Sequence, residues 1–196
     1  MVITDLPRVV RNNYEAHEWK HAIAILKSDF LNEYNDIIEI LSQFRLNKSD
    51  VLAPGGRKSP VAAKIDKEFY SKGWVEKTFQ TKIAVDDKEQ KNPTHGIDCY
   101  KNRVAVEVEW NNKDPFYDRD PNNFRVLFDM RAISVGVIIT RSDELQDIFN
   151  ALDKGKSYGA STTHMSKLLP RIEGGGGGGC PTLVFGITQA LYVEDI

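Results

Sequence analysis

The most informative segment of the 196-residue chain is GIDCYKNRVAVEVEW, residues 96–110. Its second half alternates in a way that is typical of a strand with two different faces. The two faces would carry Val104, Val106 and Val108 on one side, and Ala105, Glu107 and Glu109 on the other. Glu is depleted in strands, and carboxylates side by side on one face repel each other. The pattern therefore predicts a compensating divalent cation; the alternative is a solvated strand face with a scattered acidic patch.

The first half of the segment predicts a β-hairpin that adds a third carboxylate. Lys101–Asn102 can serve as its two-residue turn, because Asn tolerates the left-handed backbone conformation. In that register Asp98 pairs with Ala105 and lies on the same face as the two glutamates. Its Cβ atom is then roughly 5–8 Å from that of Glu107, its diagonal neighbour. Carboxylates at this separation suit a hard cation such as Mg²⁺, whose bonds to oxygen are about 2.1 Å long.

Composition places the chain among soluble globular proteins. Hydrophobic residues make up 41% and charged residues 28%, and the length fits one domain with its own core. The net charge of −2 gives no overall basic character, although a local basic cleft is enough to bind DNA. No apolar run is long enough to span a membrane, and residues 1–15 lack the apolar core of a signal peptide. We therefore expect a cytoplasmic protein without a membrane partner.

Predicted helices and strands alternate along the chain. Apolar spacing indicates helices over 15–44, with a break within 29–35, and over 59–71, 122–132 and 143–152, plus a short helix ending at residue 170. Ser59 and Pro60 are typical of an N-cap and a first turn. Strands are expected at 79–85, 134–140 and 181–187, and charged residues 86–94 are expected to form an exposed loop.

This alternation predicts an α/β domain of three layers, in which helices flank a mixed central β-sheet. We expect one domain over residues 1–196, with helices from residues 1–50 packed on its core. The six consecutive glycines at 174–179 predict a flexible surface loop. They do not form a phosphate-binding loop, because neither a Lys-Ser/Thr pair nor a helix follows them.

The order Asp98, Glu107, Glu109 is similar to the catalytic pattern of the PD-(D/E)xK nucleases. The flanking residues make the resemblance more specific, because RVAVEVEW at 103–110 resembles the catalytic strand of type II restriction endonucleases of the BglII and BstYI kind, relatives of BamHI. The segments SPVA at 59–62, KGW at 72–74, ISVGVII at 133–139 and PTLVFGI at 181–187 resemble other blocks of that group. The resemblance covers roughly residues 50–190 and implies the PD-(D/E)xK restriction-endonuclease-like core.

Two positions depart from the usual pattern of that superfamily. Ile97 stands where the motif name has Pro, a position that often varies. Glu109 stands where most of these enzymes carry Lys and the BglII kind carries Gln. BamHI is similar to this chain in having Glu there, so the substitution does not imply an inactive site. It does leave the identity of the general base open.

The resemblance implies a mechanism of Mg²⁺-dependent phosphodiester hydrolysis that leaves 5′-phosphate ends. Asp98, Glu107 and the carbonyl of Val108 would bind the metal, with one or two ions. Glu109 would orient the attacking water or accept its proton. Two further candidates on the preceding helix are Lys64, as a contact to the phosphate, and Glu68, as a contact to the metal. The alternative for both is a solvated helix face.

Candidate DNA-reading residues follow the predicted catalytic strand. Asn can bond adenine with two hydrogen bonds and Lys can donate to guanine, so the first candidates are Asn111, Asn112 and Lys113. The others are Arg119 and Arg125, together with Lys156, Ser157, Ser161, Thr162 and Thr163 of a polar loop. The alternative for both loops is ordinary exposed turn sequence.

The predicted function is sequence-specific cleavage of double-stranded DNA at a short palindrome, carried out by a homodimer. The resemblance implies a bacterial or archaeal enzyme with a cognate DNA methyltransferase, and suggests a six-base site with a central GATC. One rival is a structure-specific nuclease for DNA repair or junction resolution. A second is a catalytically silent DNA-binding module. A third is a glycosidase with paired carboxylates, which would need no metal.

Overall fold

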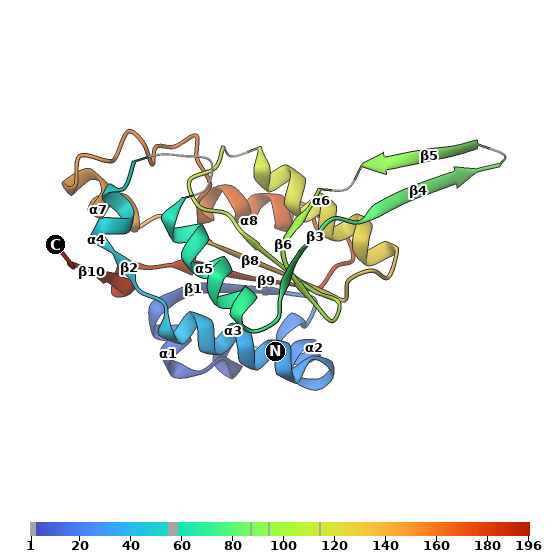
Figure 1. Ribbon diagram of the computed structural model, residues 1–196, viewed down its shortest axis with the longest axis horizontal. Helices are drawn as coiled ribbons and strands as arrows, with labels where there is room; N and C mark the ends of the chain where they lie inside the picture. The colour runs from blue at the N-terminus through green and yellow to red at the C-terminus, as the bar shows by residue number, and fades with distance from the viewer. Residues whose placement is uncertain (1–2, 55–58, 87, 94, 114) are drawn as a thin grey trace.

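The computed structural model describes residues 3–54, 59–86, 88–93, 95–113 and 115–196 (Figure 1). Within these residues a mixed six-stranded sheet has the order β1-β9-β8-β7-β6-β3. Its strands are β1 Tyr14–Trp19, β9 Thr182–Ile187, β8 Val135–Arg141, β7 Val104–Val108, β6 Ile97–Lys101 and β3 Val75–Lys77. The β7–β8 and β8–β9 pairs are parallel, and the other pairs are antiparallel. The central strands β7 and β8 are buried on both faces, as a covered parallel sheet requires.

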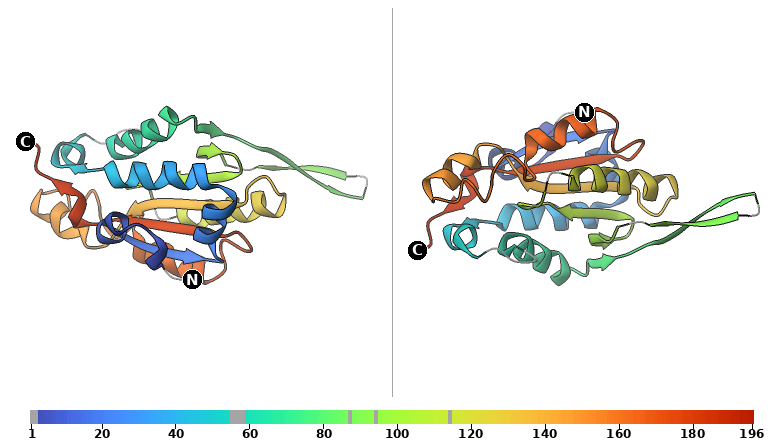
Figure 2. Two further views of the ribbon diagram at one scale, coloured as in Figure 1. Left: turned by 90° about the horizontal axis from the view of Figure 1, so that it is seen from below. Right: turned by 90° about the horizontal axis from the view of Figure 1, so that it is seen from above.

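Helices cover both faces of the sheet, so the three-layer α/β prediction is confirmed (Figure 2). Helices whose apolar side chains join the core on one face are α1 Arg8–Asn13, α2 Ala22–Asp29, α3 Leu31–Gln43, α4 Lys48–Leu52, α5 Pro60–Ser71 and α7 Leu145–Ala151. The other face is covered by α6 Phe116–Asp129 and α8 Met165–Glu173. The smaller elements are η1 Ile3–Asp5, β2 Leu46–Asn47, β4 Gln80–Val85, β5 Lys88–Pro93, η2 Gln189–Leu191 and β10 Tyr192–Val193. None of the described helices is long and apolar enough to cross a membrane.

Several helices begin or end where local sequence signals predicted a boundary. The Ser59 hydroxyl accepts a hydrogen bond from the Ala62 N–H at 3.0 Å, which caps α5. That helix ends before Gly73, whose φ of +83° suits a residue without a side chain. The expected break in the N-terminal helical region lies at Phe30, between α2 and α3.

Three predicted elements differ from the structure. Residues 15–19, expected to be helical, belong to strand β1, because pairing with β9 at the far end of the sequence outweighs the local apolar spacing. Residues 88–93, expected to be loop, form β5 and pair with β4 in a hairpin that projects from the body (Figure 1). The side chains of Lys82 and Glu89 form an exposed ion pair across this hairpin, so it needs no apolar pattern. Helix α6 begins at Phe116 instead of residue 122 and contains Pro121.

The glycine run forms a series of hydrogen-bonded turns after α8. The N–H of Gly174 donates to the Pro170 carbonyl, and the N–H of Gly178 donates to the Gly175 carbonyl, both at 2.9 Å. Gly178 has a φ of +55°, and a Cβ atom there would lie 2.5 Å from Cγ of Arg125. Glycine at this position therefore allows a close approach to α6.

We predict that Gly136→Ala destabilises the protein by about 1–3 kcal/mol, the usual cost of overpacking a core. Gly136 lies in β8, and an added Cβ atom would overlap the ring of Phe124 on α6. Chemical denaturation measures the effect. Gly177→Ala is the matched control, since its added Cβ would meet no described atom nearer than 3.7 Å. Equal stabilities of the two variants would contradict this packing.

Candidate active site

The β6–β7 hairpin places Asp98 and Glu107 on the same face, although its register differs from the expected one. Ala105 pairs with Tyr100 instead of Asp98, which is a shift of two residues. The turn is formed by Asn102 and Arg103, whose φ angles of +43° and +69° are typical of a type I′ turn. Because side chains alternate with a period of two, a shift of two residues leaves the same residues on the same face. The shift also brings Asp98 opposite Glu107 instead of diagonal to it.

Asp98 and Glu107 hydrogen-bond across the hairpin. The backbone N–H of Asp98 donates to Oε2 of Glu107 at 3.3 Å, and the N–H of Val108 donates to Oδ2 of Asp98 at 3.0 Å. Glu107 is only 1% exposed. Its second oxygen, Oε1, is buried and has no hydrogen-bond partner among the described residues. An unsatisfied buried carboxylate oxygen is costly, and a bound cation would remove that cost.

Both carboxylate oxygens of Glu109 are hydrogen-bonded. Nδ2 of Asn112 donates to Oε2 at 2.5 Å, and the guanidinium of Arg119 donates to Oε1 at 3.1 Å. Arg119 also donates through Nε to Asp120 at 2.6 Å and lies 2.9 Å from Nε2 of His95. Arg119 and Asp120 come from the first turns of α6. The early start of that helix therefore adds two residues to the site.

Burial and mutual repulsion raise the pKa values of the carboxyl groups in this cluster. Burial is the main cause for Glu107, whose pKa lies well above its usual range, followed by the charges of Asp120, Asp98 and Glu109. Burial and then Asp120 raise the pKa of Glu109 to about 9. The pKa of Asp120 is also raised, mainly by burial. The cluster therefore favours the uptake of positive charge, either as protons or as a metal ion.

A cavity of about 310 Å³ opens beside these carboxylates. Its lining residues are Ser59, Ala62, Asp66, His95, Asp98, Val108, Glu109, Trp110, Asn112, Phe116 and Arg119. The cavity thus joins the end of β7, the start of β6, helix α5 and the first turn of α6. It contains acidic, amide and guanidinium groups within one concave site, which can hold a cation and an anion together.

The residues at this cavity fit a divalent metal ion. Mg²⁺ is usually held by one or two carboxylates, with waters and substrate phosphates completing its shell. Asp98 lines the cavity, and Glu107, which is buried and bonds to Asp98 across the hairpin, could supply a second ligand through Oε1. In the part of the chain that the structure describes, no group of three or more His, Cys, Asp or Glu side chains is arranged to hold a metal. One reason is that Glu109 turns toward Asn112 and Arg119.

Helix α5 contributes a different residue from the two expected. Nζ of Lys64 donates to the Arg45 carbonyl at 2.9 Å and forms an ion pair with Asp50. Glu68 is exposed. Neither Lys64 nor Glu68 lines the cavity. Asp66 lines it instead and is 1% exposed. Its position could have been found from the sequence, because it lies on the buried stripe of Val61, Ile65 and Phe69. His95 and Asp120, which the sequence analysis also missed, have no comparable local signal.

The two predicted DNA-reading loops are joined to each other and to Glu109. The N–H of Thr163 donates to the Asn112 carbonyl at 2.8 Å, and the N–H of Asn112 donates to Oγ1 of Thr163 at 3.2 Å. Lys113 forms a backbone bridge with Thr162. Thr162 and Thr163 are therefore buried. Lys113, Lys156, Ser157 and Ser161 are exposed beside them, whereas Arg125 is exposed on α6 and bonds Asn122.

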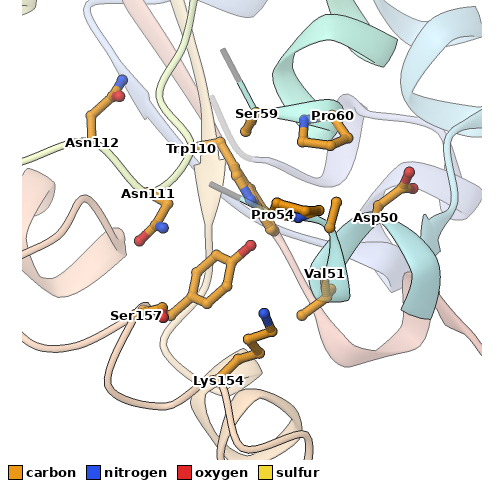
Figure 3. Close-up of a pocket in the computed structure, with 12 residues that line it drawn as sticks. Asp50, Val51, Pro54, Ser59, Pro60, Trp110, Asn111, Asn112, Lys154 and Ser157 are labelled. Carbon is orange, nitrogen blue, oxygen red and sulfur yellow. The ribbon is translucent and has the colours of Figure 1, made fainter. Parts of the chain in front are cut away.

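A second pocket of about 150 Å³ adjoins the first, because both are lined by Ser59, Trp110 and Asn112. Figure 3 shows that Lys154 and Ser157 approach it from the side opposite Ser59 and Pro60. The side chain of Asn111 lies beside it. Lys154 is thus a cation next to the predicted DNA-reading residues. It lies at the start of the predicted polar loop but was not among the residues chosen there.

The mixed sheet flanked by helices, with carboxylates on its central hairpin, is that of a restriction-endonuclease-like fold. The chain matches the family model described as "Restriction endonuclease BglII/BglIII" over residues 14–187, which is most of its length. It therefore belongs to this family, whose members are nucleases that act on DNA. Among curated proteins, none gives a significant match to the chain.

Proposed function

We propose that the protein is a type II restriction endonuclease that cleaves double-stranded DNA at a short palindrome, depends on Mg²⁺ and leaves 5′-phosphate ends. The observation that carries this proposal is the cavity in which Asp98 and Glu109 face the loop that bears Asn112. The family match supports DNA as the substrate. The carboxylate pair supports metal-assisted hydrolysis, because a phosphodiester anion repels an attacking hydroxide unless its charge is neutralised.

Asp98, Glu107 and the carbonyl of Val108 would hold the metal ion. When bound, the ion supplies charge neutralisation for the phosphate and acidifies water. With a cation bound in the cluster, which favours its ionised form, Glu109 would accept or orient the proton of the attacking water, because its carboxylate faces the same cavity. Glu107 and Glu109 are buried, so once a cation favours their charged forms these charges would act in a low-dielectric environment, where electrostatic effects are strongest.

The proposed DNA-reading surface consists of exposed and half-buried polar side chains around the two joined loops. We assign base contacts to Asn111 and Lys113, because amide and ammonium groups can read the major-groove edges of bases, whereas the amide of Asn112 donates to Glu109. We assign contacts to the DNA backbone to Lys154 and Lys156. Ser157 and Ser161 are small enough for close approach. Thr162 and Thr163 hold the loop in place from inside the protein.

A palindromic site calls for a two-fold symmetric protein, so we propose a homodimer. A methyltransferase with the same specificity would protect host DNA. The experiment that tests the function is incubation of phage DNA with the protein and Mg²⁺, followed by sequencing of the fragment ends. Discrete ends that share a palindrome, absent in EDTA, are the expected result. Intact DNA, or a smear without a common sequence, would overturn the proposal.

A further inference from the structure

Each of the three guanidinium nitrogens of Arg119 contacts a side chain of the candidate active site. Its nitrogens contact Glu109 at 3.1 Å, Asp120 at 2.6 Å and His95 at 2.9 Å. The guanidinium carbon also lies 4.2 Å from the centre of the Phe116 ring. These contacts fix both the position and the plane of the guanidinium. The Arg119 side chain is 28% exposed, whereas those of its two acidic partners are almost completely buried.

Arg119 also balances the charge of the cluster. The carboxylates of Glu109 and Asp120 are almost completely buried, and Asp98 lines the same cavity. Among the described residues that line the cavity, Arg119 is the one Lys or Arg side chain. Arg119 contacts both Glu109 and Asp120, and a buried carboxylate that loses its cation is strongly disfavoured.

We propose that Arg119 is a positioning residue for the cleavage reaction, which fixes the Glu109 carboxylate toward the cavity. This assignment rests on the proposed nuclease function. It replaces the base or phosphate contact that the sequence analysis predicted for this residue. To reach DNA, the guanidinium would have to leave two buried carboxylates, to each of which it now donates a hydrogen bond.

Asn112 also donates to the Glu109 carboxylate, and we call the contacts of Arg119 and Asn112 with Glu109 the clamp. Unlike Arg119, Asn112 is neutral and lies on a loop. Arg119 lies on α6, which packs against the sheet through Phe124 and Leu127. A group on a helix that is packed in the core is held more rigidly than one on an exposed loop. Arg119 is therefore the arm that sets the orientation of Glu109, and Asn112 completes it.

The test compares Arg119→Met with Arg171→Met in steady-state DNA cleavage with Mg²⁺. Arg171 is the matched control, because it lies on α8 and also pairs with an aspartate of α6, Asp118, at 2.7 Å. We expect Arg119→Met to lower kcat about 100-fold with little change in KM, since a misplaced catalytic group costs about that much. Arg171→Met should keep kcat near that of the wild type. Arg119→Lys should fall between, because it keeps the charge but loses the planar fork.

Chemical rescue distinguishes a positioning role of Arg119 from a merely structural one. Guanidinium ion at millimolar concentration should restore part of the kcat of Arg119→Ala and leave Arg171→Ala unchanged. Two results would overturn the assignment. One is a kcat of Arg119→Met close to that of the wild type. The other is a raised KM with unchanged kcat, which would make Arg119 a DNA-binding residue instead.

A double-mutant cycle tests the clamp without any cleavage assay. Thermal unfolding of Arg119→Met, Glu109→Gln and the double variant measures the coupling between the two side chains. We expect the two effects to be clearly non-additive, and additive effects would overturn the clamp. If the wild type cuts no DNA, the proposed function fails while this cycle still decides whether the clamp exists.

Discussion

Glu107→Gln is expected to lower the rate of DNA cleavage roughly a thousandfold or more, because metal-assisted charge stabilisation supplies several kcal/mol of the rate enhancement. The amide keeps the shape of the side chain and leaves DNA binding intact. The same change should make the metal-free protein more stable. It removes a carboxylate that lies buried among Asp98, Glu109 and Asp120 and whose Oε1 lacks a partner in the described structure.

Loss of activity together with a gain in stability separates a functional carboxylate from a structural one. Cleavage rates, DNA affinity in Ca²⁺ and the unfolding midpoint measure the three effects. Glu173→Gln is a suitable control, because Glu173 is an exposed glutamate at the end of α8. Robust cleavage by Glu107→Gln would refute its role as a metal ligand. A large loss of stability would show that Glu107 instead holds the hairpin together.

The metal-free protein is expected to become less stable as the pH rises from about 5 to about 9. The pKa values of Glu107, Glu109 and Asp120 are raised in the folded state, so the folded protein binds more protons than the unfolded chain within this range. Stability is then greatest at the acidic end and falls until the pKa of Glu109, about 9, is passed. For a protein of this size, each kcal/mol lost lowers the unfolding midpoint by about 2–4 °C.

Divalent metal should remove most of this pH dependence, because a cation replaces the protons that compensate the carboxylates. Unfolding midpoints across the pH range, with EDTA and with Ca²⁺, measure the effect. The slope should also flatten in the double variant Glu107→Gln, Glu109→Gln. A midpoint that rises with pH in EDTA, or an equal slope with and without metal, would show that the cluster is compensated in another way.

The sequence predicted the part of the site that depends on strand periodicity. Alternation alone put Asp98, Glu107 and Glu109 on one face, and this survived a shift of two residues in the register. The sequence showed that Glu109 stands where most nucleases of this pattern carry Lys, but it did not show which cation would lie nearby; in the structure Arg119 contacts Glu109 at 3.1 Å. That contact depends on where α6 begins, and the Asn- and Pro-rich segment before residue 122 gave no helical pattern.

Elements that depend on distant partners were harder to predict. Strand β1 pairs with β9, which lies at the other end of the chain, and its own residues resemble the start of a helix. His95 and Asp120 reach the site only through the packing of a loop and a helix against β6 and β7. Asp66 is different, because a charged residue on an otherwise apolar helix stripe is visible in the sequence.

The bonds between the two DNA-reading loops have a consequence for engineering. Thr163 is bonded twice to the backbone of Asn112, and its hydroxyl lies 3.5 Å from the carbonyl of Glu109. A loop grafted at 154–163 to read a new sequence would therefore displace the end of the catalytic strand unless residues 111–113 were exchanged with it. If the proposed function holds, a change in one loop would alter both DNA specificity and turnover, and a useful library would vary the two loops as one unit.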